Sequence, residues 1–173
     1  YVVDRLDQPL FERGVRYVPS HPMAGREFSG FAYSTADLYQ HASYIVTPTE
    51  RTDRDALHTV TALARQLGFD NIAVSTPKAH DQSIAFTSQL PHALAVALIN
   101  SDKEGRDTSR FIGDSYRDLT RIANINEALW SELFFANKSA LIEEIGQFER
   151  SLNDVKRALE SGDEAALKAL MRQ

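Results

Sequence analysis

The stretch Ala42-Ser43-Tyr44-Ile45-Val46-Thr47-Pro48 decides how the first half of the chain folds. Its β-branched and aromatic residues are typical of a strand, and Pro48 ends it. A helix follows, with Thr52 or Asp53 as its cap, Gly68 as its stop, and a single apolar face built from Leu57, Val60, Ala64 and Leu67. A second strand covers residues 71–75. Strand, helix and strand in this order predict a crossover in a mixed or parallel sheet.

Residues upstream of this unit predict a strand that ends at a histidine. After Gly14, the apolar run from Val15 to Ser20 is expected to form a strand, and a loop from His21 to Thr35 follows it. Before Gly14, residues 2–10 have rough helical spacing, and Pro9 is expected to lie where that helix frays. His21 is therefore a candidate functional residue, because reactive side chains often occupy loops at strand ends.

The second half of the chain has a helical pattern throughout. Pro77 suits a first helical turn with Thr76 as its cap, and this helix is expected to reach Asn100. Further helices are expected over residues 108–123, from Glu127 onwards, and after a break at residues 161–163. We expect an α+β protein with a boundary near Ser75, dividing residues 1–75, with a short mixed sheet, from an all-helical part at 76–173.

An apolar seam with heptad spacing runs along the C-terminal half. Its residues are separated by 4, 3, 4, 3 and 4 positions: Leu141, Ile145, Phe148, Leu152, Val155 and Leu159. A period near 3.5 favours packing against another long helix. The partner helix belongs either to the same bundle or to a second subunit.

Polar residues on the helix after Pro77 form a candidate site. Asp81, Ser88 and His92 fall on one face among apolar neighbours. Pro91 inside this helix removes a backbone hydrogen bond, at a cost of about 3 kcal/mol that a purely structural helix has little reason to carry. The polar face either lines a wet pocket or forms a buried polar cluster that ties helices together.

Two arginines one helical turn apart form a second candidate site. Arg117 and Arg121 repel each other unless negative charge lies nearby. Asp114 and Asp118 could supply that charge, as on many solvated helix faces. A carboxylate ligand is the alternative, because the planar guanidinium binds carboxylates through two parallel hydrogen bonds.

Composition excludes several classes of function. The 173 residues carry a formal net charge of −5 and no cysteine. Binding to nucleic acid or to an anionic membrane would require a basic surface, and disulfides, zinc-thiolate sites and thiol catalysis require cysteine. No apolar run approaches the roughly 20 residues of a spanning helix. With no secretory signal pattern at its start, the chain is expected to be cytoplasmic.

Three other chemistries lack their motifs. Gly25 and Gly30 have P-loop spacing, but Phe31-Ala32 replaces the Lys-Ser/Thr pair that binds phosphate. His80-Asp81 is a weak metal signal without a second spaced histidine, so no metal is expected. A serine hydrolase would require a Gly-x-Ser-x-Gly elbow, which the sequence lacks.

Three strings in order resemble the prephenate and arogenate dehydrogenases. The first is His21-Pro-Met-Ala-Gly. The second, from His80-Asp81 to Pro91-His92, is similar to the family's His-Asp…Ser-His-Leu-Pro-His helix. The third, from Tyr116 to Ala123 with the later Trp130 and Asn137-Lys138, is similar to its Phe-x-Asp-x-Thr-Arg-Ile-Ala segment. Together they span residues 21–138.

The resemblance implies an oxidative decarboxylation in tyrosine biosynthesis. NAD or NADP takes a hydride from the ring carbon that bears the hydroxyl, and loss of carbon dioxide makes the ring aromatic. His21 would deprotonate the ring hydroxyl. Arg121 would hold a substrate carboxylate with Arg117 nearby, Ser88 and His92 would place the ring, and Trp130 would lie near the pocket. A homodimer joined through the helical half is also implied.

The sequence departs from the family pattern in three places. Gln89 stands where the family often has histidine, which bears on the choice between prephenate and arogenate. Arg26 stands where Ser or Thr is common, and it adds a cation near the substrate carboxylates. No Gly-x-Gly-x-x-Gly occurs, so the cofactor-binding residues are unknown. Residues 1–75 are then interpreted as the last strands of a Rossmann-type domain, and these 173 residues alone are expected to be inactive.

Two other functions remain open at this point. The chain could be a non-catalytic module that dimerises and binds ligand. It could also belong to another hydroxyacid or imine oxidoreductase with a helical C-terminal half.

Overall fold

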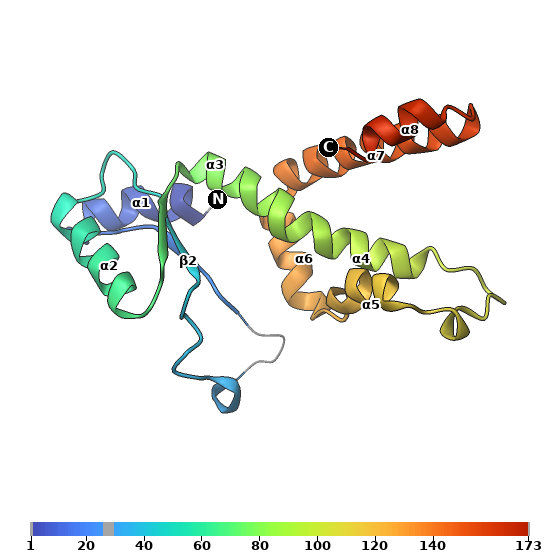
Figure 1. The fold of residues 1–173 in the computed structure, drawn as a ribbon. Coiled ribbons are helices and arrows are strands. Elements are labelled where there is room, and N and C mark those ends of the chain that lie inside the picture. Colours follow the sequence, from blue (N-terminus) through green and yellow to red (C-terminus); the bar gives the residue numbers. More distant parts are fainter. Residues whose placement is uncertain (1, 26–29, 173) are drawn as a thin grey trace. The chain divides into compact units, whose positions relative to one another are not determined.

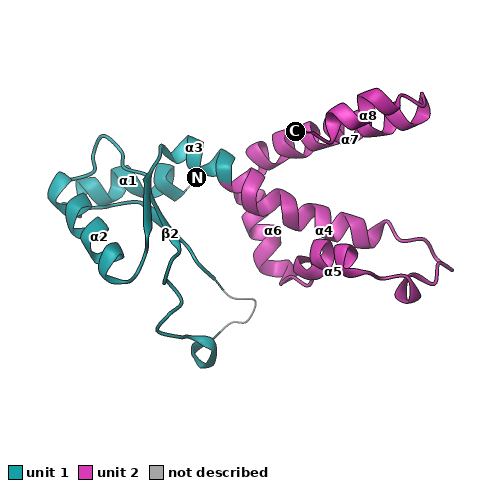
Figure 2. Ribbon diagram, viewed as in Figure 1, with its two compact units in different colours: residues 1–83 teal, residues 84–173 magenta. Residues whose placement is uncertain are grey.

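The computed structural model describes residues 2–25 and 30–172. Within it the chain forms two compact units, Tyr1–Ser83 and Ile84–Gln173, coloured separately in Figure 2. The first contains a sheet with helices before, between and after its strands, and the second consists of helices.

A mixed three-stranded sheet organises the first unit. Strands β1 (Ser20–Met23), β2 (Ser43–Val46) and β3 (Asn71–Val74) lie in the order β1-β2-β3. β1 is antiparallel to β2, and β2 is parallel to β3. Helix α2 (Arg54–Gln66) makes the connection from β2 to β3 and packs beside β3 (Figure 1). The predicted strand-helix-strand crossover is confirmed.

The first strand begins five residues later than predicted. Residues 15–19 have no regular structure, and β1 covers Ser20–Met23, so His21 lies inside a strand instead of in a loop after one. Two local features explain the shift. Gly14 adopts φ +72° and the Val15 amide donates to the Leu10 carbonyl, so this backbone closes helix α1. Pro19 has no amide hydrogen to donate to a ladder.

Helix α1 (Val2–Glu12) also extends further than its sequence suggests, because Pro9 lies inside it. Helix α2 is capped as expected, with Asp53 accepting a hydrogen bond from the Ala56 amide at 2.8 Å. Phe69 is buried, with its ring stacked on that of Tyr39 and tilted against that of Tyr44. Val46 in β2 is fully buried.

Gly68, the predicted helix stop, occupies a position that favours glycine over other residues. Its φ of +97° lies in the left-handed region, and a Cβ added there would fall 2.4 Å from the side-chain nitrogen of Gln40. Just before β2, a single-turn segment η1 (Phe31–Tyr33) and a turn at residues 36–41 complete this unit.

The second unit is helical, as predicted. Helix α3 (Pro77–Ile84), which belongs to the first unit up to Ser83, leads into a π-helical turn η2 (Ala85–Gln89) and helix α4 (Leu90–Asn100). The other α-helices are α5 (Asp114–Thr120), α6 (Glu127–Ala136), α7 (Lys138–Glu160) and α8 (Glu164–Leu170). Figure 1 shows α5 beside α4 and α8 beside α7.

The predicted helix over residues 108–123 is instead three short pieces. They are η3 (Thr108–Arg110), α5 and η4 (Arg121–Ala123). Gly113 separates the first two because its backbone is extended, with φ −98° and ψ −177°. The α+β class, with a small mixed sheet followed by a helical part, is confirmed.

Pro91 coincides with the π-helical turn. In a regular α-helix its amide would donate to Thr87, but proline has no amide hydrogen. The turn before it is wound so that the Leu90 amide donates to the carbonyl of Ala85, five residues earlier. The change from α-helix to π-helix in this turn thus accommodates the hydrogen bond that Pro91 cannot make. Among the described residues, no helix combines the length and the apolar character needed to cross a membrane.

Candidate functional site

His21 is held in the middle of a strand. Its backbone lies opposite Ile45 in the antiparallel ladder of β1 and β2. Its ring meets the ring of His80 edge-on, with centroids 5.2 Å apart and planes at 67°. The Nδ1 atom of His21 lies 2.9 Å from Nε2 of His80. One nitrogen of the imidazole is therefore engaged by His80.

His80 is in turn bonded to its neighbour Asp81. Nδ1 of His80 lies 2.9 Å from Oδ1 of Asp81, and the His80 side chain is mostly buried. The start of α3 fixes both residues, because the Ala79 amide donates to the hydroxyl of Thr76, which caps the helix. The side chains of His21, His80 and Asp81 are thus linked one to the next by hydrogen bonds, and they do not converge on one point. Within the described part of the chain, no group of histidines and carboxylates is arranged to hold a metal ion.

The pKa of His21 is lowered from its ordinary value. Burial is the larger cause, because it removes water from the charged imidazolium, and the neighbouring His80 is the smaller one. A lowered pKa keeps His21 neutral, and able to accept a proton, over a wider range of pH.

In the helical unit, Ser88, His92 and Trp130 lie together. The rings of His92 and Trp130 are stacked, with centroids 3.7 Å apart and planes at 27°. Nδ1 of His92 donates to the Ser88 carbonyl at 2.8 Å. Trp130 also meets Phe134 edge-on at 5.6 Å. These contacts fix the tautomer of His92, so that in the neutral ring Nε2 carries the lone pair.

Gln89 is buried, with 4% of its surface exposed, and both ends of its amide are used inside the protein. Its Nε2 donates to the Leu133 carbonyl at 3.0 Å, and its Oε1 accepts from Nδ2 of Asn137 at 3.0 Å. The π-helical turn is thereby tied to the junction between α6 and α7. This geometry favours a structural role for Gln89, and its predicted contact with substrate stays a prediction.

Replacing Gln89 with leucine should lower the free energy of unfolding by about 1–3 kcal/mol, because the Leu133 carbonyl and the Asn137 amide lose their hydrogen bonds to the buried Gln89 amide. The measurement is urea unfolding of the full-length protein. Gln82→Leu is the matched control, since Gln82 is exposed on α3. Equal unfolding midpoints for the two variants would contradict the structural role.

Arg117 and Arg121 both lie on the surface of the helical unit. Arg117 pairs with Asp114 at 3.1 Å, and both side chains are largely exposed, so the ion pair contributes little to stability. Arg121 is the first residue of η4 and is exposed. The solvated pairing considered for Arg117 is therefore present. Arg26 lies outside the described residues.

Two family models match the chain in sequence order. Residues 2–72 match "Prephenate dehydrogenase, nucleotide-binding domain", and residues 76–173 match "Prephenate dehydrogenase, dimerization domain". The chain belongs to the prephenate dehydrogenase family. The predicted division after residue 75 stays a prediction, because the compact units of the structure meet instead at Ser83 and Ile84.

Curated relatives in the family cover nearly all of this chain. The prephenate dehydrogenase of Bacillus subtilis is 30% identical over 94% of the chain and 44% of its own length. The cyclohexadienyl dehydrogenase of Zymomonas mobilis is 32% identical over 84% of the chain and 51% of its own length. The chain thus spans about half the length of these relatives.

Solved structures of the family have the same fold. Synechocystis arogenate dehydrogenase matches 98% of this chain and 63% of its own chain, with a TM-score of 0.84 and 26% identity. Aquifex aeolicus prephenate dehydrogenase in complex with hydroxyphenyl propionate and NAD+ matches 96% of this chain and 60% of its own, with a TM-score of 0.84 and 32% identity.

Sequence reasoning about this family member missed the link from His21 to His80 and Asp81. The sequence presents His80-Asp81 as a weak metal signal, as part of a polar helix face and as the start of a family motif, but not as the partner of His21. Its position, just after the cap of the helix that follows β3, was the available clue. Asn137 was quoted within a motif, but nothing in its spacing indicated that it would bind Gln89.

Proposed function

We propose that the full-length protein carrying this chain is an NAD(P)-dependent prephenate or arogenate dehydrogenase. The proposed reaction is oxidative decarboxylation, in which the ring hydroxyl loses its proton, its carbon loses a hydride, and carbon dioxide leaves. The observation that carries the proposal is the imidazole of His21, half-buried in a strand with Nδ1 engaged by His80. Membership of the family supports the choice of substrate.

His21 is the proposed base. With Nδ1 directed to His80, its Nε2 is the atom that takes the proton from the ring hydroxyl. The substrate O–H bond breaks and an N–H bond forms on His21. Its lowered pKa means that the neutral form needed for this step persists below the usual titration range of histidine.

Arg121 is the proposed ligand for a substrate carboxylate, with Arg117 and Arg26 adding positive charge. His92 has a narrower role. Because Nδ1 donates to the Ser88 carbonyl, neutral His92 offers only an acceptor at Nε2, and it binds a carboxylate only when protonated. The indole of Trp130, stacked on His92, holds that ring in place.

We propose that the residues of this chain supply only part of the dinucleotide site. The sequence has no Gly-x-Gly-x-x-Gly, the loop that brings backbone amides to a pyrophosphate. A bound nicotinamide would supply the acceptor for the hydride. The 173 residues by themselves are accordingly proposed to be inactive, and assays require the full-length protein.

The direct test is hydride transfer. Full-length protein is mixed with prephenate or arogenate and with NAD+ or NADP+, and reduced cofactor is followed by absorbance at 340 nm. Turnover of either substrate is expected, and the four combinations reveal both preferences. Absence of turnover with both substrates, together with reduction of some other keto acid or imine, would reject the proposal.

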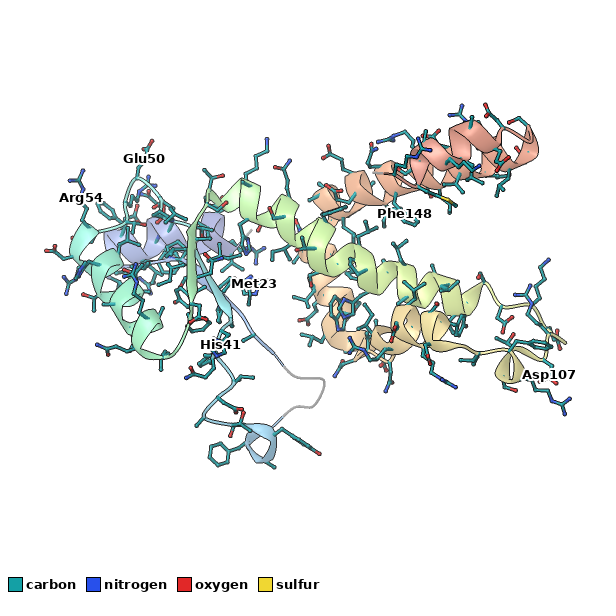
Figure 3. The ribbon with its side chains drawn as sticks, viewed as in Figure 1. Met23, His41, Glu50, Arg54, Asp107 and Phe148 are labelled. Carbon is teal, nitrogen blue, oxygen red and sulfur yellow. The ribbon has the colours of Figure 1, made fainter. Side chains whose placement is uncertain are left out.

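We also propose that the helical part forms a homodimer. A cavity of about 600 Å³ lies among α4, α5, η4 and α7, lined mainly by apolar residues that include Leu94, Leu98 and Phe148. Phe148 is labelled on α7 in Figure 3. On the predicted seam, Leu152 and Leu159 are 56% and 62% exposed. Exposed apolar residues at heptad spacing favour a subunit interface over internal packing alone.

Leu152→Glu should convert the proposed dimer to monomer, because a charge would enter the proposed apolar contact between subunits, where Leu152 is 56% exposed in the single chain. Light scattering coupled to size-exclusion chromatography gives the mass. The control is Leu63→Glu, since Leu63 is similarly exposed on α2 in the other unit. A Leu152→Glu protein with unchanged dimer mass would place the interface elsewhere.

A further inference from the structure

A line of three polar side chains runs from the surface of α3 into β1. It begins at the carboxylate of Asp81, continues through His80 and ends at His21, and both intervals are 2.9 Å. His80 uses Nδ1 toward Asp81 and Nε2 toward His21, and His21 uses Nδ1 toward His80. The order of the three groups therefore dictates where the hydrogens lie.

The carboxylate sets the direction, because an ionised carboxylate can only accept hydrogen bonds. Nδ1 of His80 must then carry a hydrogen, which leaves Nε2 of neutral His80 as an acceptor. Nδ1 of His21 must in turn donate to that atom. The remaining nitrogen of His21, Nε2, is left with its lone pair. A carboxylate two residues along the line thus selects the basic tautomer of His21.

The backbone holds the line in place at both ends. His21 is fixed by the ladder of β1 and β2, and His80 by a capped helix start. Among the described residues, His80 from α3 faces His21 with Asp81 behind it, while the residue opposite on β2, Ile45, does not titrate. His80 also has little access to water that could compete for its nitrogens.

We propose that Asp81 and His80 are positioning residues that hold His21 in the tautomer able to accept the substrate proton. The inference rests on the proposed function for its catalytic meaning, and on the contacts of the first unit for its geometry. During the reaction the proton from the substrate hydroxyl resides on Nε2 of His21. The new positive charge is then shared along hydrogen bonds that end at a negative carboxylate. No proton has to reach Asp81.

The substitution Asp81→Asn gives a specific prediction, because an amide can donate as well as accept. If the new amide donates to Nδ1 of His80, the line reverses, and His80 donates from Nε2 to Nδ1 of His21. Nε2 of His21 then carries the hydrogen and cannot act as a base. Asp81→Asn should therefore lower kcat by about 10²-fold or more, with KM within a few-fold of its original value. Asp81→Glu should recover part of kcat, since it keeps the acceptor.

Nitrogen NMR reads the tautomer without any substrate. In full-length protein labelled with ¹⁵N-histidine, His21 is expected to show a protonated Nδ1 and an unprotonated Nε2 near neutral pH. In Asp81→Asn the two signals should exchange character. Asp70→Asn is the matched control, because Asp70 forms a similar pair with His41 on the surface of the same unit.

The outcomes separate the two proposals. If the protein does not oxidise prephenate or arogenate, the proposed function fails, and the NMR signals alone decide whether the line sets the tautomer. If wild-type His21 is protonated at Nε2, the inference is overturned whatever the activity. It is also overturned if Asp81→Asn keeps kcat within a factor of about three.

Discussion

Replacing His21 with asparagine should lower kcat of the full-length protein by about 10²-fold to 10⁴-fold, the usual contribution of a positioned base. Asparagine is close in size to histidine and can still hydrogen-bond His80, so the strand should keep its place. It cannot accept a proton at neutral pH. The measurement is steady-state formation of reduced nicotinamide with the preferred substrate, and KM should change little because substrate binding depends on other residues.

The control for this variant is His58→Asn, since His58 is exposed on α2. In the unmodified protein, kcat/KM should fall as the pH drops through the pKa of His21, because only the neutral ring accepts a proton. That pKa is lowered by burial and by His80, so the fall should occur below the ordinary value of about 6.5. A variant that keeps kcat within tenfold would remove His21 from the reaction.

Arg121→Ala should reduce kcat/KM by about 10²-fold, mainly through a higher KM. The physical reason is the loss of a charge-assisted, two-pronged hydrogen bond to a substrate carboxylate, an interaction worth about 1.5–3 kcal/mol. Arg121→Lys keeps the charge but loses the planar fork, so an intermediate value is expected. Steady-state kinetics over a wide range of substrate concentration gives both parameters.

Arg110→Ala is the matched control for this series. Arg110 is also exposed in a short helical turn of the same unit, and it pairs with Asp107 at 3.0 Å. Its removal should leave kcat/KM unchanged. If Arg110→Ala and Arg121→Ala were equally impaired, the effect would reflect general electrostatics and not a bound carboxylate.

Elements with strong local patterns were predictable from the sequence. The crossover from β2 through α2 to β3 follows from one β-branched run, one amphipathic face and a capping aspartate. Strand β1 was predicted too early because residues 15–18 have strand propensity. In the structure the backbone after Gly14 closes helix α1, and Pro19 has no amide hydrogen to donate to a neighbouring strand. Local propensity is a weak guide where neighbouring backbone bonds decide the outcome.

The sequence indicated candidate site residues, but it did not indicate which of them contact one another. His21, Ser88, His92 and Trp130 were named from motifs, and the structure shows the contact of His92 with Trp130. The bond from His21 to His80 joins residues 59 positions apart, and no periodicity reports such a pairing. Gln89 illustrates the opposite case. It stands where the family often has histidine, which indicated a ligand contact that stays a prediction, and the structure shows its amide bonded to the α6–α7 junction.

The pairing of β1 with β2 also affects how chains of different length should be aligned with this one. Ser20 is opposite Val46 and Met23 is opposite Ser43, and successive side chains of a strand point to opposite faces. An insertion or deletion between Met23 and Ser43 changes only the length of the connection, so the histidine keeps its orientation. A gap of a single residue placed inside Ser20–Met23 would turn that imidazole to the opposite face of the sheet, away from α3. Alignment gaps within these four positions should therefore be treated as errors.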